Sequence, residues 1–97
     1  MTSPTALQVP DHVHWRRFND EVVIVDLKHG EYYGLNEVAA AVFEHLAGGQ
    51  SPSDVVGSLL EEYDVARADL ERDVGRLLEE LIGKGFLETI VVGSAIA

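Results

Sequence analysis

The side chains that could do chemistry in this chain are its histidines, serines and carboxylates, and their spacing limits what they can do. The four histidines are scattered: His12 and His14 alternate in an extended run, His29 sits in a turn, and His45 falls late in a helical pattern. A zinc site needs three or four converging ligands, and no HExxH or similar spacing occurs. The chain has no cysteine, which excludes disulfides, thiolate metal sites and cysteine nucleophiles. We therefore expect no metal ligand and no cofactor.

The remaining polar groups predict no catalytic residue. Ser51 and Ser53 are explained by helix capping, and Ser58 lies in Val-Gly-Ser-Leu rather than in a GxSxG elbow. No glycine-rich phosphate loop is present. The carboxylates of the second half have the spacing of solvated helix faces; they are Glu61, Glu62, Asp69, Glu71, Asp73, Glu79 and Glu80. We expect a protein that is not an enzyme.

Composition and charge narrow the range of partners. The 97 residues fit one domain, and 46% hydrophobic with 25% charged residues is ordinary globular composition. The 17 acidic and 7 basic residues give a net charge of −10, whereas binding to a nucleic-acid backbone relies on Lys and Arg. No apolar stretch approaches the ~20 residues of a membrane span, and the first residues lack the pattern of a secretory signal. We expect a cytoplasmic protein with no nucleic-acid or membrane partner.

The front third has the pattern of a three-stranded meander. Extended runs cover residues 12–18, 21–27 and 31–35, and the second of these is rich in β-branched residues. Asn19-Asp20 marks the first turn and residues 28–30 mark the second, where Gly30 is free to take a positive φ angle.

The rest of the chain has helical periodicity. Asn36 caps a first helix that ends at Gly48-Gly49, Ser51-Pro52 opens a second, and a third covers about residues 67–84 before Gly85. The fold class predicted is α+β and winged-helix-like, with a three-stranded antiparallel sheet followed by three helices. We expect a flexible N-terminal arm over residues 1–11, one domain over 12–88, and a C-terminal tail over 89–97. Within the tail, residues 89–92 have the composition of a short strand, and 93–97 are expected to be frayed.

The third strand, Glu31–Leu35, is expected at an edge of the sheet. It reads EYYGL, with one charge and neither proline nor lysine, so it lacks the features that usually protect an exposed edge. Two interpretations remain open at this point. The edge is covered by the third helix or the tail, or it accepts a guest peptide as an additional strand, with side-chain pockets on the neighbouring helix.

The run from Val23 to Asn36 resembles a pattern of PqqD-like proteins: two hydrophobic residues, then Asp26, Gly30, Tyr32, Leu35 and Asn36 at the family's spacing. Three later segments match the rest of that pattern: Leu46-Ala47-Gly48-Gly49, the run from Asp73 to Leu81, and Gly85-Phe86-Leu87. PqqD-like proteins are the precursor-peptide recognition elements of ribosomal peptide natural-product pathways. The resemblance covers residues 13–88, and the chain looks most like the separate leader-binding half of a split lasso-peptide B protein.

The resemblance implies a mode of binding. The leader segment of the precursor lies antiparallel along residues 31–35, in a groove walled by the third helix. The peptide-binding residues that we expect are Glu31, Tyr32, Tyr33, Gly34, Leu35, Asp69, Leu70, Asp73, Val74, Arg76 and Leu77. The implied partners are the precursor leader peptide and a transglutaminase-like cysteine leader peptidase, with the lasso cyclase as a further candidate.

The sequence also bears on three other functions. The chain has Asn36-Glu37-Val38-Ala39-Ala40 where lasso-type members often have Asn-x-x-Gly-Ala, and its third helix begins at Ala66-Arg67 without the usual proline or acidic cap. The alternative is therefore a PqqD-like peptide chaperone for a radical-SAM or other modifying enzyme. A carrier protein is disfavoured because the first third is strand-like. A winged-helix regulator is disfavoured because the third helix is rich in acids.

Overall fold

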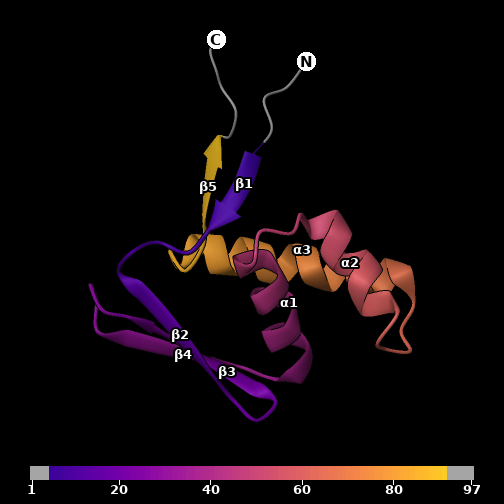
Figure 1. Ribbon diagram of the computed structural model, residues 1–97, viewed down its shortest axis with the longest axis horizontal. Helices are drawn as coiled ribbons and strands as arrows, with labels where there is room; N and C mark the ends of the chain where they lie inside the picture. Colours follow the sequence, from indigo (N-terminus) through magenta and orange to yellow (C-terminus); the bar gives the residue numbers. More distant parts are fainter. Residues whose placement is uncertain (1–4, 92–97) are drawn as a thin grey trace.

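The computed structural model describes residues 5–91, and its centre is a three-stranded antiparallel sheet (Figure 1). The strands are β2 (Val13–Phe18), β3 (Glu21–Asp26) and β4 (Glu31–Leu35), in the spatial order β2-β3-β4. Asn19 takes a φ of 56° in the first turn and Gly30 a φ of 69° in the second. The register places Ile24 opposite both Trp15 and Tyr33. The predicted meander is confirmed.

Three helices follow the sheet, and two of them begin with side-chain caps. They are α1 (Glu37–Ala47), α2 (Pro52–Leu60) and α3 (Arg67–Gly83). Asn36 accepts the N–H of Ala39 at 3.2 Å, and Ser51 accepts the N–H of Asp54 at 3.1 Å. Ala66 gives α3 no side-chain cap, as its sequence implied. The predicted α+β, winged-helix-like class is confirmed.

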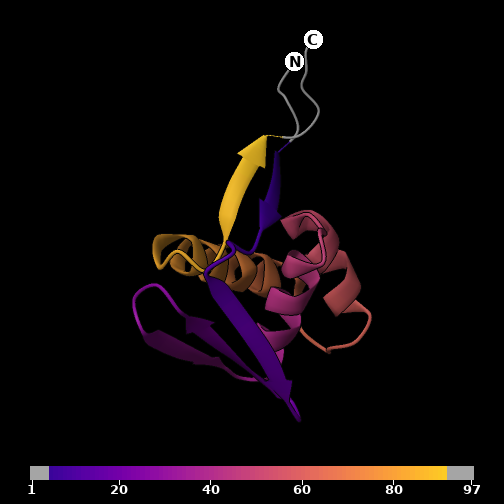
Figure 2. The same ribbon diagram turned by 60° about the vertical axis from the view of Figure 1, so that its left-hand side comes forward.

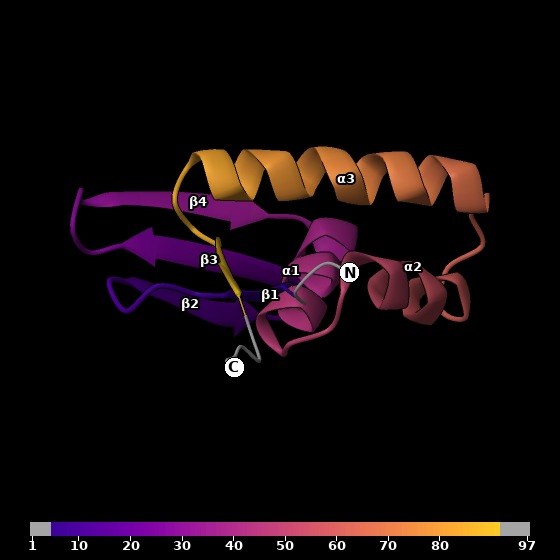
Figure 3. The same ribbon diagram turned by 90° about the horizontal axis from the view of Figure 1, so that it is seen from above.

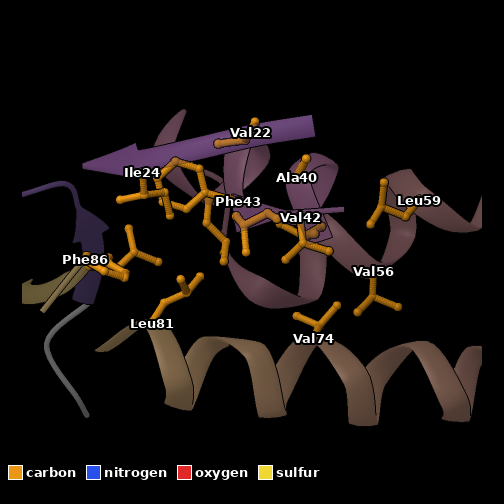
Figure 4. Packing of buried hydrophobic residues seen from close by; sticks show 14 of the residues in the cluster. Val22, Ile24, Ala40, Val42, Phe43, Val56, Leu59, Val74, Leu81 and Phe86 are labelled. Carbon is orange, nitrogen blue, oxygen red and sulfur yellow. The ribbon is translucent and has the colours of Figure 1, made fainter. Parts of the chain in front are cut away.

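One hydrophobic core joins the sheet to all three helices (Figure 4). Val22 and Ile24 project from β3 toward Phe43 on α1, which is fully buried. The edge of the Trp15 ring packs on the Phe43 ring, with centroids 5.3 Å apart. The helices add further buried side chains: Val42, Leu46, Val55, Val56, Leu59, Leu70, Val74 and Leu81. This packing fixes α1 and α3 relative to the sheet.

A two-stranded ribbon that the sequence analysis did not anticipate stands apart from this sheet (Figures 1 and 2). β1 (Thr5–Gln8) pairs antiparallel with β5 (Glu88–Val91). The flexible arm expected over residues 1–11 therefore contains a strand, because its partner comes from the far end of the chain. The short strand expected near residues 89–92 is present. Residues 1–4 of the arm and the frayed tail expected over 93–97 lie outside the described residues, and the domain boundaries at 12 and 88 stay predictions.

Within residues 5–91, no helix has both the length and the apolar character needed to cross a membrane.

Candidate binding groove

The outer edge of β4 presents backbone groups that no strand within residues 5–91 uses, since β4 pairs there with β3 alone. The N–H of Leu27 donates to the carbonyl of His12 at 2.8 Å, so the odd-numbered residues of β3 direct their backbone groups toward β2. These groups alternate sides along an antiparallel strand, and the even-numbered residues of β3 therefore pair with β4. By this register, the N–H and C=O groups of Tyr32 and Gly34 point to the open edge.

A buried carboxylate holds the turn that leads into β4. Asp26 is 1% exposed and accepts the backbone N–H groups of Lys28 at 2.9 Å and His29 at 3.1 Å. Its Oδ2 also lies 2.8 Å from Nδ1 of the His29 ring. The hydrogen bond with this ring holds the pKa of Asp26 below its ordinary value; burial opposes the shift and the two backbone N–H groups support it. The start of the β4 edge is thereby fixed.

Tyr33 joins β4 to the C-terminal half of α3, which runs alongside the strand (Figure 3). The Tyr33 hydroxyl donates to Oε2 of Glu80 at 2.5 Å, and Nζ of Lys84 lies 5.1 Å from the centre of its ring. The ring centroid is 5.8 Å from that of Phe86. The hydrogen bond to Glu80 and burial both raise the pKa of Tyr33. A shallow hollow at this end is lined by Gly30, Glu31, Tyr32, Tyr33, Lys84 and Phe86.

An apolar hollow lies beyond the other end of β4, between α1 and α3. Its floor contains the buried side chains of Val42, Leu70 and Val74, and Val38 stands at its rim with 38% of its surface exposed. The remaining lining residues are Asn36, Ala39, Asp73 and Leu77. A hydrophobic side chain of a guest can pack here, with the Asp73 carboxylate beside it.

The apolar hollow borders an acidic hollow near the start of α3, and the edge of β4 together with the hollows beside it is called the groove below. This second hollow shares Val38, Leu70 and Asp73 with the first and adds Asp64, Val65, Ala66, Asp69 and Arg72. Arg72 donates to Asp69 at 3.0 Å, whereas Asp64 and Asp73 form no ion pair within residues 7–89. The hollow near the start of α3 is therefore lined by an excess of acids, whereas the hollow near the β3–β4 turn is lined by one acid, Glu31, and one base, Lys84.

The residues predicted for the site are spread along this groove. Glu31 to Leu35 form β4, where Tyr32 is 78% exposed while Leu35 is buried in the core. Of the predicted α3 residues, five line the hollows: Asp69, Leu70, Asp73, Val74 and Leu77. Arg76 is exposed and lines neither hollow. As peptide contacts, all of these stay predictions.

Sequence reasoning missed the α1 wall and the cross-groove contact. Val38 and Val42 were not among the predicted site residues, although their i, i+4 spacing after Asn36 already placed them on one helix face. Glu80 was counted as a solvated acid, and no local signal joins it to Tyr33, 47 positions earlier.

Within the described part of the chain, no group of three or more His, Cys, Asp or Glu side chains is placed to hold a metal ion. What the groove combines is an open strand edge, an apolar hollow and charged ends. This set of features matches the recognition of an extended peptide by strand addition.

Comparison with solved structures finds two close relatives of similar size. The structure described as "TbiB1 in Complex with the TbiA(beta) Leader Peptide" is 34% identical with a TM-score of 0.79, covering 92% of this chain and 99% of that one. "Lasso peptide synthetase B1 complexed with the leader peptide" is 33% identical with a TM-score of 0.78, covering 84% of this chain and 96% of that one.

A third structure, the heterocyclase TruD, shares the fold alone. It is 21% identical with a TM-score of 0.65, and the match covers 95% of this chain but 12% of that one. No curated protein sequence matches. The family described as "Coenzyme PQQ synthesis protein D (PqqD)" matches residues 21–87, which span β3, β4 and all three helices. The resemblance seen in the sequence is confirmed, and the chain belongs to the PqqD family.

Proposed function

We propose that this chain binds the leader segment of a ribosomally made precursor peptide in lasso-peptide biosynthesis. The leader adds to β4 as an antiparallel strand and lies between β4 and α3. The observation that carries the proposal is the open edge at Tyr32 and Gly34 beside the apolar hollow of α1 and α3. Support comes from the two B1 proteins, which share the fold at over 30% identity and are described in complex with leader peptides.

The energetics suit a reversible binder. Backbone pairing at Tyr32 and Gly34 supplies affinity without reading sequence, at about 0.5–1.5 kcal/mol net per hydrogen bond. One or two apolar side chains buried in the hollow add about 2 kcal/mol each. Because β4 is held in place by Asp26 at one end and by Leu35 in the core at the other, little strand ordering remains to be done on binding.

The test is a matched pair of substitutions at Gly34. Gly34→Pro removes an N–H that points to the guest, whereas Gly34→Ala keeps it, and a Cβ at this position meets nothing within 4 Å. We expect the proline variant to lose at least about tenfold in affinity for a fluorescent lasso-type leader, or ~1.4 kcal/mol. The alanine variant is expected to bind like the unaltered chain. Equal anisotropy titrations for the two folded variants would contradict strand addition.

The bound leader is then presented to a separate enzyme. We infer that this enzyme is a cysteine leader peptidase of the transglutaminase-like type, with the lasso cyclase as a further partner, and that the chain itself catalyses nothing. The likeness to a lasso peptide synthetase B1 protein favours this partner over a radical-SAM enzyme. We place the activity in the cytoplasm, where precursors are made; this location follows from the proposed role.

A further inference from the structure

The α3 wall of the groove carries a carboxylate that is held in one position. Oε2 of Glu80 accepts the hydroxyl of Tyr33 at 2.5 Å, and this contact joins α3 to β4. The same hydrogen bond raises the pKa of Tyr33, so the hydroxyl remains a donor. A carboxylate has two acceptor oxygens, and Tyr33 uses only Oε2. Oε1 is therefore left for another donor.

The charge of Glu80 is not neutralised by a base of its own chain within residues 7–89, where its carboxylate forms no ion pair. Lys84 follows Glu80 by four positions, the spacing at which glutamate and lysine on a helix often pair. Its Nζ instead lies 5.1 Å from the centre of the Tyr33 ring. A cation brought by a guest would therefore find Glu80 already in place and without an ion-pair partner in that part of the chain.

A leader strand added at β4 brings one side chain to this carboxylate. Residues directly opposite each other in an antiparallel pair share a face. The side chain of Tyr33 points toward α3, and α3 runs alongside β4 (Figure 3). The leader side chain opposite Tyr33 therefore also points toward α3, beside the Tyr33 ring and Glu80. Its neighbours in the leader, opposite Tyr32 and Gly34, point to the other face of the sheet.

The surroundings of Glu80 decide which leader side chain fits there. An apolar side chain would cover Glu80 without giving it a partner, and an unpaired charge that loses its water is costly. An acidic side chain would meet Glu80 and also Glu31, which lines the hollow at the same end of β4. A lysine or arginine would pair with Oε1 of Glu80 and lay its apolar stem on the Tyr33 ring. The net charge of −10 adds a long-range attraction for a cation.

Among the residues that line the hollow at this end, Lys84 is the base that would favour an acidic side chain instead. Its ammonium is exposed on a flexible four-carbon stem, so it can turn away from a second cation. The Glu80 carboxylate, in contrast, is held by the Tyr33 hydroxyl. A group held in place loses less freedom on pairing than a mobile one, and Glu80 therefore decides the preference.

We propose that Glu80, positioned by Tyr33, makes the groove select a leader with lysine or arginine opposite Tyr33. This inference rests on the proposed function, because strand addition at β4 defines that leader position. Glu80 is then a specificity-determining residue, and Tyr33 is its positioning residue. Backbone pairing at Tyr32 and Gly34 reads no side chain, so this ion pair gives the groove a requirement that the strand edge alone does not supply.

The experiment is a charge scan of a fluorescent lasso-type leader against matched variants. Each leader position in turn carries lysine or glutamate, and anisotropy gives the affinity of both peptides. Glu80→Gln removes the charge but keeps an acceptor for Tyr33, and Glu79→Gln makes the same change at the adjacent exposed residue as the control. We expect one position at which lysine binds at least about fivefold tighter than glutamate, ~1 kcal/mol. Glu80→Gln reduces that preference to less than about twofold, and Glu79→Gln leaves it unchanged.

Tyr33→Phe tests the positioning role, since it keeps the ring beside Phe86 and removes the hydroxyl. It is expected to weaken the peptide with lysine at that position more than the peptide with glutamate. Equal weakening of the two peptides would mean that Tyr33 acts through packing alone, and the positioning role would be wrong.

The outcomes separate this inference from the proposed function. If the leader binds but no position has a lysine preference that depends on Glu80, the specificity is wrong while the proposed function stands. A preference lost equally in Glu80→Gln and Glu79→Gln would come from the overall charge and would also contradict the inference. An unaltered chain that binds no leader overturns the proposed function, and this inference with it.

Discussion

At the scale of single residues, each residue of β4 points its backbone N–H and C=O groups either toward β3 or toward the open edge. This direction decides whether the residue serves the fold or the binding of a guest. Tyr33 and Leu35 direct their backbone groups to β3 and their side chains toward the helices, so both are committed to the fold. Tyr32 and Gly34 direct their backbone groups outward. A proline at Tyr33 would break the β3–β4 ladder, whereas a proline at Gly34 removes an N–H that only a guest would use. The binding edge is therefore tested at Gly34.

The lowered pKa of Asp26 leads to a prediction about how stability depends on pH. Its pKa is lowered in the folded chain by the His29 ring, so its contribution to stability is present above the ordinary value of 3.8 and is lost as the pH falls through the lower folded value. We expect Asp26→Asn to lower the free energy of unfolding in urea at pH 6, with the difference from the unaltered chain shrinking below about pH 4. If the difference in free energy of unfolding stays constant from pH 6 to pH 3, the charge of Asp26 does not contribute to stability.

The position of Asp73 leads to a prediction about how charge affects leader binding. It is exposed at the junction of the apolar and acidic hollows. For a leader with a basic residue at this end, Asp73→Lys is expected to weaken binding about fivefold, ~1 kcal/mol, and to change its salt dependence. Glu79→Lys makes the same charge change on another face of α3 and is the control. Identical salt slopes for the two variants would exclude Asp73 from the site.

At the scale of elements, α3 separates its binding face from its solvent face. Gly75 follows Asp73 by two positions, which at 3.6 residues per turn places it almost on the opposite side of the helix. A Cβ at Gly75 meets nothing within 4 Å, so no close helix contact requires glycine there. We expect Gly75→Ala to raise the free energy of unfolding by about 0.5–1 kcal/mol, measured in urea, with leader affinity unchanged. A weaker leader affinity would mean that the guest reaches this face.

Most elements were predictable because their signals are local. Asn36 and Ser51 mark helix starts as capping residues, Pro52 is suited to a first helical position, and the residue types Asn and Gly mark the turns at positions 19 and 30. The groove was harder to predict from the sequence. Which backbone groups of β4 face outward depends on the register with β3 and β2, and that register is a property of the sheet. The contact between Tyr33 and Glu80 likewise depends on how α3 crosses the strand.

At the scale of the whole molecule, the ribbon of β1 and β5 lay furthest from local prediction. Thr5–Gln8 reads TALQ between two prolines, and nothing in it identifies a partner 80 residues away. Its formation depends on the core, against which Leu7 and Val9 pack. The ribbon brings the two ends of the described chain together on the opposite side of α3 from the three-stranded sheet (Figures 1 and 2).

Because the ribbon and the groove share no residue, stability and binding should separate when the ribbon is removed. Deletion of residues 1–8 takes away β1 with its hydrogen bonds to β5 and the partly buried side chain of Leu7. We expect the free energy of unfolding in urea to fall by about 1–3 kcal/mol, with leader affinity within about twofold of the full chain. Deletion of residues 1–4 keeps β1 and is the matched control. A folded β1 deletion with at least tenfold weaker leader binding would show that the leader also contacts the ribbon, and the groove would then extend beyond β4 and α3.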